Sequence, residues 1–278
     1  MPQSLPNKIS HLLETGFHPQ QEPYLANLVC RYLKQHQIWM EQKLRVPLGK
    51  ATFFFGIADP LGVLAPGEVH IDFSSPFVDA VTGATYRSLN NIDILVARQP
   101  ACRPSDIQKV RAVKRPELSH MVDVVVFSSR GQYPLAGKLQ GGDYDGDKFW
   151  LCWEPDLVHP FQNAPAPLTA LLPQQYGIRK DTRTLREVMT HRELSTVDNL
   201  LKEVLDFRMA PNLLGVVTNF LEKQAYKENR LSSTRLNALY DMHDLLVDAP
   251  KNGYIFSQAD YNYFIRSCLL YTSDAADE

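Results

Sequence analysis

The chain has 278 residues, of which 44% are hydrophobic and 22% are charged, and its formal net charge is -2. These values are ordinary for a globular protein with a sizeable core, built as one large domain or two closely associated ones. They exclude a strongly basic chain, so any nucleic-acid partner must be held by a local patch of positive charge.

The four cysteines lie far apart and form no Cys-x-x-Cys pair, which indicates neither a zinc site nor a disulfide framework. This usage is typical of a reducing compartment. The first residues lack the apolar core of a signal peptide, and no run of about 18 apolar residues occurs. We therefore expect a protein of the cytoplasm or nucleus that is not secreted and has no membrane partner.

The first part of the chain, residues 1–45, is expected to be a helical lead-in segment. Apolar side chains recur there at helical spacing and predict an amphipathic helix over 23–44.

Residues 46–160 change to short apolar runs rich in β-branched and aromatic residues, separated by Gly and Pro. The runs predict strands over 52–57, 68–73, 92–97, 107–113, 122–127 and 148–153. About six short strands at uneven spacing favour a small barrel, although composition does not name its type.

A Pro-rich linker at residues 163–167 ends this region. Apolar stripes and capping residues beyond it predict helices over 182–209, 211–229, 232–249 and 257–270. We assign these helices to a C-terminal domain, residues 168–270, and expect the tail 271–278 not to be native.

The most informative stretch is Gly141-Gly142-Asp143-Tyr144-Asp145-Gly146-Asp147, which carries carboxylates at three alternate positions. Neighbouring like charges raise carboxylate pKa values, and a divalent cation is the simplest way to keep all three ionised. Mg²⁺ fits best because it prefers oxygen ligands, and Mn²⁺ can substitute for it. A strand would place the three carboxylates on one face, and Gly146 lets the chain curl so that they converge.

Three other interpretations of this stretch stay open. Asp145-Gly146 is also a common centre of a two-residue hairpin turn, although a turn does not need the other two aspartates. A calcium-binding helix-loop-helix would need glycine where Lys148 stands and helices where the flanks predict strands. A solvated acidic loop is the third, and it fits poorly between two apolar runs.

Residues 97–138, directly before the acidic stretch, contain eight basic and three acidic side chains. We call these basic side chains the basic wall. Such a surface would suit the phosphates of a nucleic acid, which bind Lys and Arg. Arg98 closes an apolar strand, so its guanidinium could make bidentate phosphate contacts. The other candidates for phosphate binding in the wall are Arg103, Lys109, Arg111 and Lys114.

The acidic stretch resembles the signature of the eukaryotic cell-encoded RNA-dependent RNA polymerases of RNA silencing, in which an Asp-x-Asp-Gly-Asp loop holds catalytic Mg²⁺. Two upstream blocks resemble the family's Phe-Gly-x-x-Asp and Arg-Asn-Pro-Cys-x-x-Pro-Gly-Asp motifs, namely Phe54-Phe55-Gly56-Ile57-Ala58-Asp59 and Arg98-Gln99-Pro100-Ala101-Cys102-Arg103-Pro104-Ser105-Asp106. Asn212-Leu213-Leu214-Gly215 and residues 243–253 resemble its C-terminal motifs. The resemblance covers about residues 44–266, and Gln99 and Ser105 depart from it.

This resemblance implies an α+β protein, with a double-psi β-barrel catalytic domain flanked by helical segments. It also implies nucleotide addition from nucleoside triphosphates on a single-stranded RNA template, with Asp143, Asp145 and Asp147 binding the metal in a two-metal site. Lys251 matches a family position and joins the candidate phosphate-binding residues. Its neighbours Asn252 and Gly253 are equally typical of a helix-ending turn.

Two other functions stay open. A fragment of a DNA-dependent RNA polymerase largest subunit carries a similar loop, Asn-Ala-Asp-Phe-Asp-Gly-Asp, from which this chain differs at Gly141, Gly142 and Tyr144. A non-catalytic barrel that binds RNA through the basic wall is the second. In the family the catalytic centre lies between two barrels, and residues 1–44 do not resemble the other barrel, so we expect an upstream half of the core to be missing here.

Overall fold

The computed structural model describes residues 4–43, 48–167, 171–190, 196–209 and 212–270. Contacts divide the chain into two compact units. One consists of residues 1–49 together with 80–82, and the other contains the rest of the chain. The predicted tail 271–278 lies outside the described residues.

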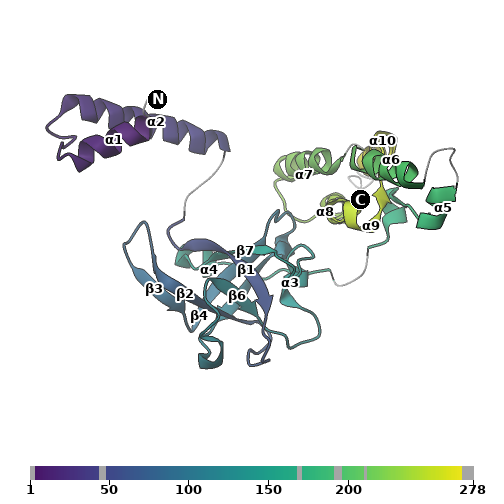
Figure 1. The fold of residues 1–278 in the computed structure, drawn as a ribbon, viewed down its shortest axis with the longest axis horizontal. Coiled ribbons are helices and arrows are strands. Elements are labelled where there is room, and N and C mark those ends of the chain that lie inside the picture. The colour runs from purple at the N-terminus through teal and green to yellow at the C-terminus, as the bar shows by residue number, and fades with distance from the viewer. Residues whose placement is uncertain (1–3, 44–47, 168–170, 191–195, 210–211, 271–278) are drawn as a thin grey trace, which may run out of the picture. The chain divides into compact units, whose positions relative to one another are not determined.

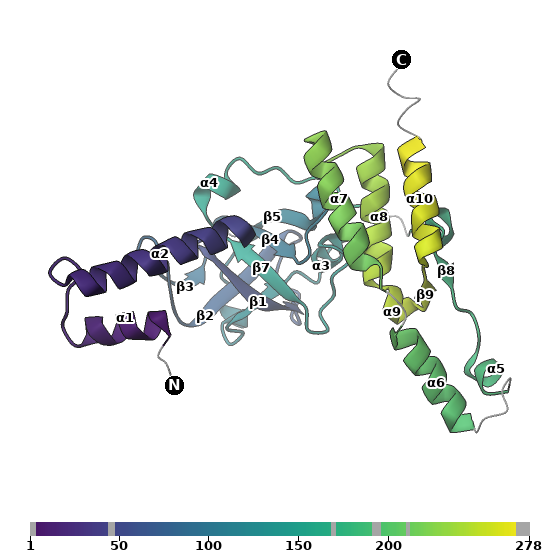
Figure 2. The same cartoon turned by 90° about the horizontal axis from the view of Figure 1, so that it is seen from above.

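The first unit contains two helices, α1 (Leu5–Glu14) and α2 (Pro23–Lys43), which lie side by side in Figures 1 and 2. Ile9 of α1 packs with Leu25 and Leu28 of α2. The predicted helix over 23–44 matches α2, whereas α1 was not predicted. Ser4 caps α1, since its hydroxyl accepts a hydrogen bond from the backbone N–H of Asn7 at 3.5 Å.

The second unit begins with a seven-stranded sheet (Figure 1). Its strands are β1 (Ala51–Ala58), β2 (Glu68–Val78), β3 (Thr85–Leu89), β4 (Ile92–Arg98), β5 (Ile107–Ala112), β6 (Val124–Phe127) and β7 (Lys148–Cys152). Their order is β3-β2-β5-β4-β7-β1-β6, and an additional pairing between β2 and β6 closes six of them into a barrel. The pairs β1–β6 and β2–β5 are parallel, and the remaining pairs are antiparallel.

All six predicted strands are present, and their alternating apolar side chains form the barrel core. That core includes Val69, Ile71, Val96, Phe149 and Leu151, each fully buried. The structure corrects the prediction at β3, which was missed, and at β2, which continues beyond residue 73 to Val78 across an irregularity in its pairing with β3. Closure of the barrel leaves no free edge among the six strands, which stabilises strands as short as the four residues of β6.

Helices follow the barrel in the same unit: α5 (Leu185–Thr190), α6 (Thr196–Met209), α7 (Leu214–Glu228), α8 (Thr234–Val247), α9 (Ala249–Asn252) and α10 (Gln258–Leu270). A second core joins side chains of α7, α8 and α10, among them Val217, Leu239 and Phe264 (Figure 2). The predicted helix 182–209 covers both α5 and α6, with 191–195 outside the described residues. A two-stranded sheet of β8 (Arg179–Lys180) and β9 (Tyr254–Ile255) was not predicted.

Short helical segments also occur in the loops, including η1 (Pro104–Asp106), η2 (Pro116–Leu118), α3 (Leu135–Lys138), α4 (Pro155–Val158) and η3 (Pro173–Tyr176). Within the described parts of the chain, no helix has both the length and the apolar character needed to cross a membrane.

Candidate active site

The three aspartates lie in the loop between α3 and β7, and one carboxylate oxygen from each lies within 4.8 Å of the others. The convergence predicted from sequence is therefore present, but in a loop rather than on one face of a strand. Gly146 has φ +126°, which side chains rarely adopt, and this supports its predicted role in the curl. A helix, α3, precedes the loop, so it is not a two-residue hairpin, and a strand, β7, follows it, so it is not a calcium-binding helix-loop-helix.

Tyr144, between the first two aspartates, fixes which way the loop faces. Its ring packs against Phe127 of the barrel core, with the ring centroids 5.7 Å apart. Asp143 and Asp145 point the other way, and their side chains are 53% and 66% exposed. The backbone N–H of Asp145 donates to Oδ1 of Asp143 at 3.2 Å, and that of Asp143 donates to Oδ2 of Asp147 at 3.0 Å. The carboxylates are thus tied together by the loop's own backbone.

Asp147 is held by Arg98 at the end of β4. The guanidinium contacts both carboxylate oxygens, with Nε 2.8 Å from Oδ2 and Nη2 3.0 Å from Oδ1. Nη1 of Arg98 donates to the side chain and the backbone carbonyl of Gln140 at 2.9 and 3.1 Å. Arg98 therefore makes a bidentate contact with an aspartate of this chain, and its binding of phosphate stays a prediction.

Gly142 permits this close arrangement. A Cβ at this position would lie 2.9 Å from Cδ of Arg98 and 3.0 Å from the carbonyl oxygen of Ala136, which is too close for any side chain. Gln140, whose side chain and carbonyl orient Arg98, was not identified from sequence. Only the structure reveals its role, because there Gln140 is a buried polar residue with φ +54°.

Lys251, at the end of α9, faces the first two of the three carboxylates. Its Nζ lies 4.0 Å from Oδ2 of Asp143 and 3.8 Å from Oδ2 of Asp145. Gly253 ends α9 with φ +67°, so the expected helix-ending turn is also present. The structure thus brings Lys251 to the aspartates, and its binding of phosphate stays a prediction.

Asp143 and Asp145 affect each other's ionisation. A hydrogen bond with Asp145 lowers the pKa of Asp143, helped by the backbone N–H of Asp145 and the charge of Lys251. The same hydrogen bond and the negative charge of Asp143 raise the pKa of Asp145, although Lys251 acts in the opposite direction. A divalent cation would remove the repulsion that raises the second pKa, and three converging carboxylates are oxygen donors of the kind that Mg²⁺ binds.

The remaining candidates from the basic wall meet other partners. Arg103 binds Asp241 and Asp244 of α8 at 2.7 and 2.9 Å and is 11% exposed. Nζ of Lys109 donates to backbone carbonyls of residues 158 and 161. Arg111 pairs with Asp93, and Nζ of Lys114 lies 3.7 Å from Asp72. Phosphate binding by these four residues stays a prediction.

The contacts of Arg103 belong to a polar junction between barrel and helices that sequence reasoning did not find. Asp106 accepts hydrogen bonds from the backbone N–H groups of Cys102 and Arg103, and burial raises its pKa to about 6 against these bonds. His243, fully buried in α8, lies 3.8 Å from Sγ of Cys102 and 3.5 Å from Asp244. The junction joins α8, which leads directly into α9 and Lys251, to the barrel.

Comparison with known proteins shows which family the chain resembles. The family model for RNA-dependent RNA polymerase matches residues 1–269. The chain is 28% identical to RNA-dependent RNA polymerase 1 of Arabidopsis thaliana over 89% of its own length and 20% of the relative's. It is 28% identical to RNA-dependent RNA polymerase 1 of Schizosaccharomyces pombe, over 88% of its own length and 20% of the relative's.

Among solved structures, the RNA-dependent RNA polymerase QDE-1 from Thielavia terrestris superposes with a TM-score of 0.85 at 38% sequence identity. The match covers 96% of this chain and 29% of that one. It agrees with the expected α+β class and the double-psi form of the barrel. The chain is only about a fifth of the length of the two curated relatives. Because the family model spans nearly the whole chain, the chain belongs to the RNA-dependent RNA polymerase family.

Proposed function

We propose that the chain carries the aspartate half of a catalytic centre that extends RNA on a single-stranded RNA template. In this reaction the 3′-hydroxyl of the growing strand attacks the α-phosphate of a nucleoside triphosphate and pyrophosphate leaves. The observation that carries the proposal is the convergence of Asp143, Asp145 and Asp147 on a barrel of this family. In keeping with the family resemblance, we assign the product to RNA silencing and the protein to the cytoplasm or nucleus.

The three carboxylates would hold Mg²⁺, for which Mn²⁺ can substitute. Bound there, the ions would lower the pKa of the attacking hydroxyl and stabilise the attacking and leaving oxygens. Asp143 and Asp145 are open to solvent and accessible to ions and substrate, whereas Asp147 is held in one orientation by Arg98. No nucleophile from the protein is needed, because the substrate supplies the attacking oxygen.

Lys251 is placed to neutralise charge beside the aspartates. Its side chain is 69% exposed, and its ammonium group lies about 4 Å from two carboxylates. When those carboxylates bind metal, the ammonium becomes available to a phosphate oxygen of the triphosphate. We also propose that basic residues outside this chain complete the triphosphate site, as the much greater length of the relatives allows.

The test is a chimera in which this chain replaces the matching segment of the Thielavia terrestris polymerase. We expect Mg²⁺-dependent incorporation of nucleotides on a single-stranded RNA template and none after chelation of the metal. Incorporation on DNA alone would instead support the alternative of a DNA-dependent polymerase. RNA binding by a folded chimera that incorporates nothing would support the non-catalytic barrel, and either result would overturn the proposal.

A further inference from the structure

A pocket lies at the other end of β7, the strand that follows the aspartate loop. It has a volume of about 410 Å³, within the range of about 300–1,000 Å³ typical of small-molecule sites. The strand β7 starts next to Asp147 and ends next to Trp153, which lines the pocket. At about 3.3 Å per residue, the strand separates the two sites by about 20 Å.

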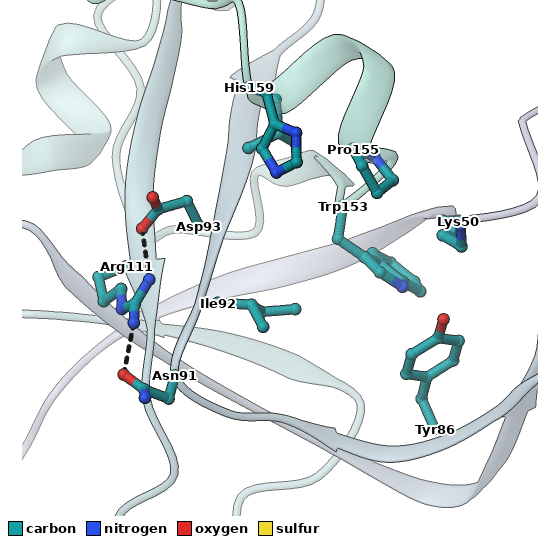
Figure 3. A pocket seen from close by; sticks show the side chains of 10 residues that line it. Lys50, Tyr86, Asn91, Ile92, Asp93, Arg111, Trp153, Pro155 and His159 are labelled. Carbon is teal, nitrogen blue, oxygen red and sulfur yellow. Dashed lines mark hydrogen bonds and ion pairs between the residues drawn. The ribbon is translucent and has the colours of Figure 1, made fainter.

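One side of the pocket is aromatic. Trp153 and Tyr86 meet edge to face, with centroids 5.6 Å apart, and Figure 3 shows both rings on the same side of the pocket. Trp153 is 5% exposed and is fixed from behind by Phe77, with their centroids 4.9 Å apart. Ile92 extends the apolar lining toward the opposite side. A flat ring on a ligand could therefore contact a rigid aromatic wall, which is how proteins hold bases without reading their sequence.

The indole N–H of Trp153 has no hydrogen-bond partner among the described residues. A buried donor without an acceptor costs about 1–3 kcal/mol, so such groups in native proteins call for an explanation. The hydroxyl of Tyr86 points to the same side of the pocket (Figure 3). This hydroxyl would suit a ring that carries its own acceptors and donors rather than a purely apolar ligand, whereas the indole N–H is itself buried.

The opposite side is cationic. Nη1 of Arg111 donates to Asp93 at 2.9 Å, and Nη2 donates to the side chain of Asn91. These bonds orient the guanidinium but use only two of its five N–H donors. Lys50 lines the pocket on the aromatic side, beside Trp153 (Figure 3), and its Nζ lies 3.4 Å from Oε1 of Glu154. Arg111 is 42% exposed, which leaves it accessible to an anionic group of a ligand.

We propose that this pocket binds a nucleotide, either free or as one unit of a single-stranded RNA. The base would lie against Tyr86 and Trp153, the sugar over Ile92, and the phosphate at Arg111. The aromatic side of the pocket matches the flat base of a nucleotide. The cation on the opposite side matches its negatively charged phosphate. The choice of nucleotide as the ligand rests on the proposed function, whereas the pocket is independent of the aspartate loop.

The experiment measures binding without catalysis, in protein that carries Asp145→Asn and with the metal chelated. The probes are ATP and a short oligouridylate, titrated with tryptophan fluorescence and equilibrium dialysis as readouts. We expect Tyr86→Ala and Arg111→Ala each to weaken binding about tenfold. Arg87→Ala is the matched control, because this exposed arginine is next to Tyr86 on β3 but on the other face of the strand.

Binding of ATP alone would identify a site for free nucleotide, and binding of RNA alone would identify a site for a strand. Binding of neither probe, or equal affinity in all variants, would overturn the proposal. If Tyr86→Ala does not fold, binding by Tyr86→Phe and Arg111→Ala tests the proposal instead, since both substitutions change little of the core. Because no incorporation is measured, failure here is distinct from failure of the chimera to polymerise.

Discussion

Asp147 differs from the other two aspartates in its surroundings. Its side chain is 16% exposed, and both of its oxygens are contacted by Arg98. The arginine in turn is held by Gln140 in a space that only a glycine at position 142 leaves free. A rigid ligand of this kind lowers the cost of assembling a metal site, because its orientation is set before the ion arrives. We infer that Arg98 acts as a positioning residue for Asp147.

This inference predicts the behaviour of Arg98→Lys in the active chimera. Lysine keeps the charge but loses the planar fork that contacts both oxygens. Changes in groups that orient a metal ligand typically cost 10–100-fold in metal affinity or activity. We therefore expect incorporation to need about tenfold more Mg²⁺ in a titration of the initial rate. Arg87→Gln, at an exposed residue of β3, is the control and should leave the Mg²⁺ dependence unchanged. An unchanged dependence in Arg98→Lys would contradict the positioning role.

Asp145 is the most exposed carboxylate of the three, so its replacement should disturb the fold least. In the chimera, Asp145→Asn should slow elongation by at least about 10³-fold, or about 4 kcal/mol of transition-state stabilisation. RNA binding, measured by filter retention, should persist. Near-normal elongation would refute the metal assignment, and an equal loss of RNA binding would indicate a role in folding.

At the level of elements, the position of Lys251 depends on how α8 meets the barrel. Arg103 comes from the loop before η1, and it binds two carboxylates of α8 while lying 5.4 Å from the ring centroid of Tyr240. The last buried leucine of α8, Leu246, comes two residues after Asp244. The next helix, α9, then brings Lys251 to the aspartates. The short helix α9 has no buried residue of its own, so we expect the junction on α8 to set where Lys251 lies.

The junction predicts a stability that depends on pH. Burial lowers the pKa of His243, but hydrogen bonds with Asp244 and Cys102 outweigh it and raise the value from 6.5 to about 9. Protonated His243 therefore stabilises the folded state fully below pH 6.5, and this contribution is lost as the pH rises through 9. The loss should amount to at most about 3 kcal/mol.

The measurement is the urea midpoint of unfolding between pH 6 and pH 10, compared with that of Asp244→Asn. Removing the carboxylate that pairs with His243 should lower the midpoint at pH 6 and flatten its fall toward pH 10. Asp198→Asn, on α6, serves as a control for the loss of a negative charge. A slope that stays the same in Asp244→Asn would show that His243 does not cause it.

For the whole molecule, the decisive fact is how much of the catalytic centre this chain contains. It spans 20% of the length of the first curated relative and 29% of the polymerase whose structure it matches. Asp143 and Asp145 are more than half exposed, and Lys251 is the cation that pairs with both of them. Phosphoryl transfer requires fixed positive charge around the leaving pyrophosphate and exclusion of water.

We therefore expect the isolated 278-residue chain to bind Mn²⁺ or Mg²⁺ but not to incorporate nucleotides on a template. Its carboxylates need only water and the ion to form a weak site. Activity should appear when the upstream half of the core is supplied in the same chain or as a second polypeptide. The readouts are Mn²⁺ binding by electron paramagnetic resonance and a primer-free incorporation assay. Template-directed synthesis by the chain alone would contradict this view.

The sequence by itself determined the features that depend on residues close together in the chain. The alternating apolar runs predicted every strand of the closed barrel, since the period of two follows from strand geometry. The three aspartates predicted a metal site because they lie within five consecutive residues, so their negative charges are necessarily close together. The strand β3 and the helix α1 escaped prediction, since Thr85–Leu89 is short and largely polar and Leu5–Glu14 has only one buried residue.

Only the tertiary structure decided the partners of the charged residues. Arg98 lies 49 positions from Asp147, and Arg103 lies more than 130 positions from both of its carboxylates. In sequence both arginines belong to one basic wall, yet one orients Asp147 and the other joins the helices to the barrel. Pairing over such separations is set by which strands are neighbours and by how the chain crosses between them. Local periodicity carries no information about either, so the sequence predicted the charge of these residues and the fold decided its use.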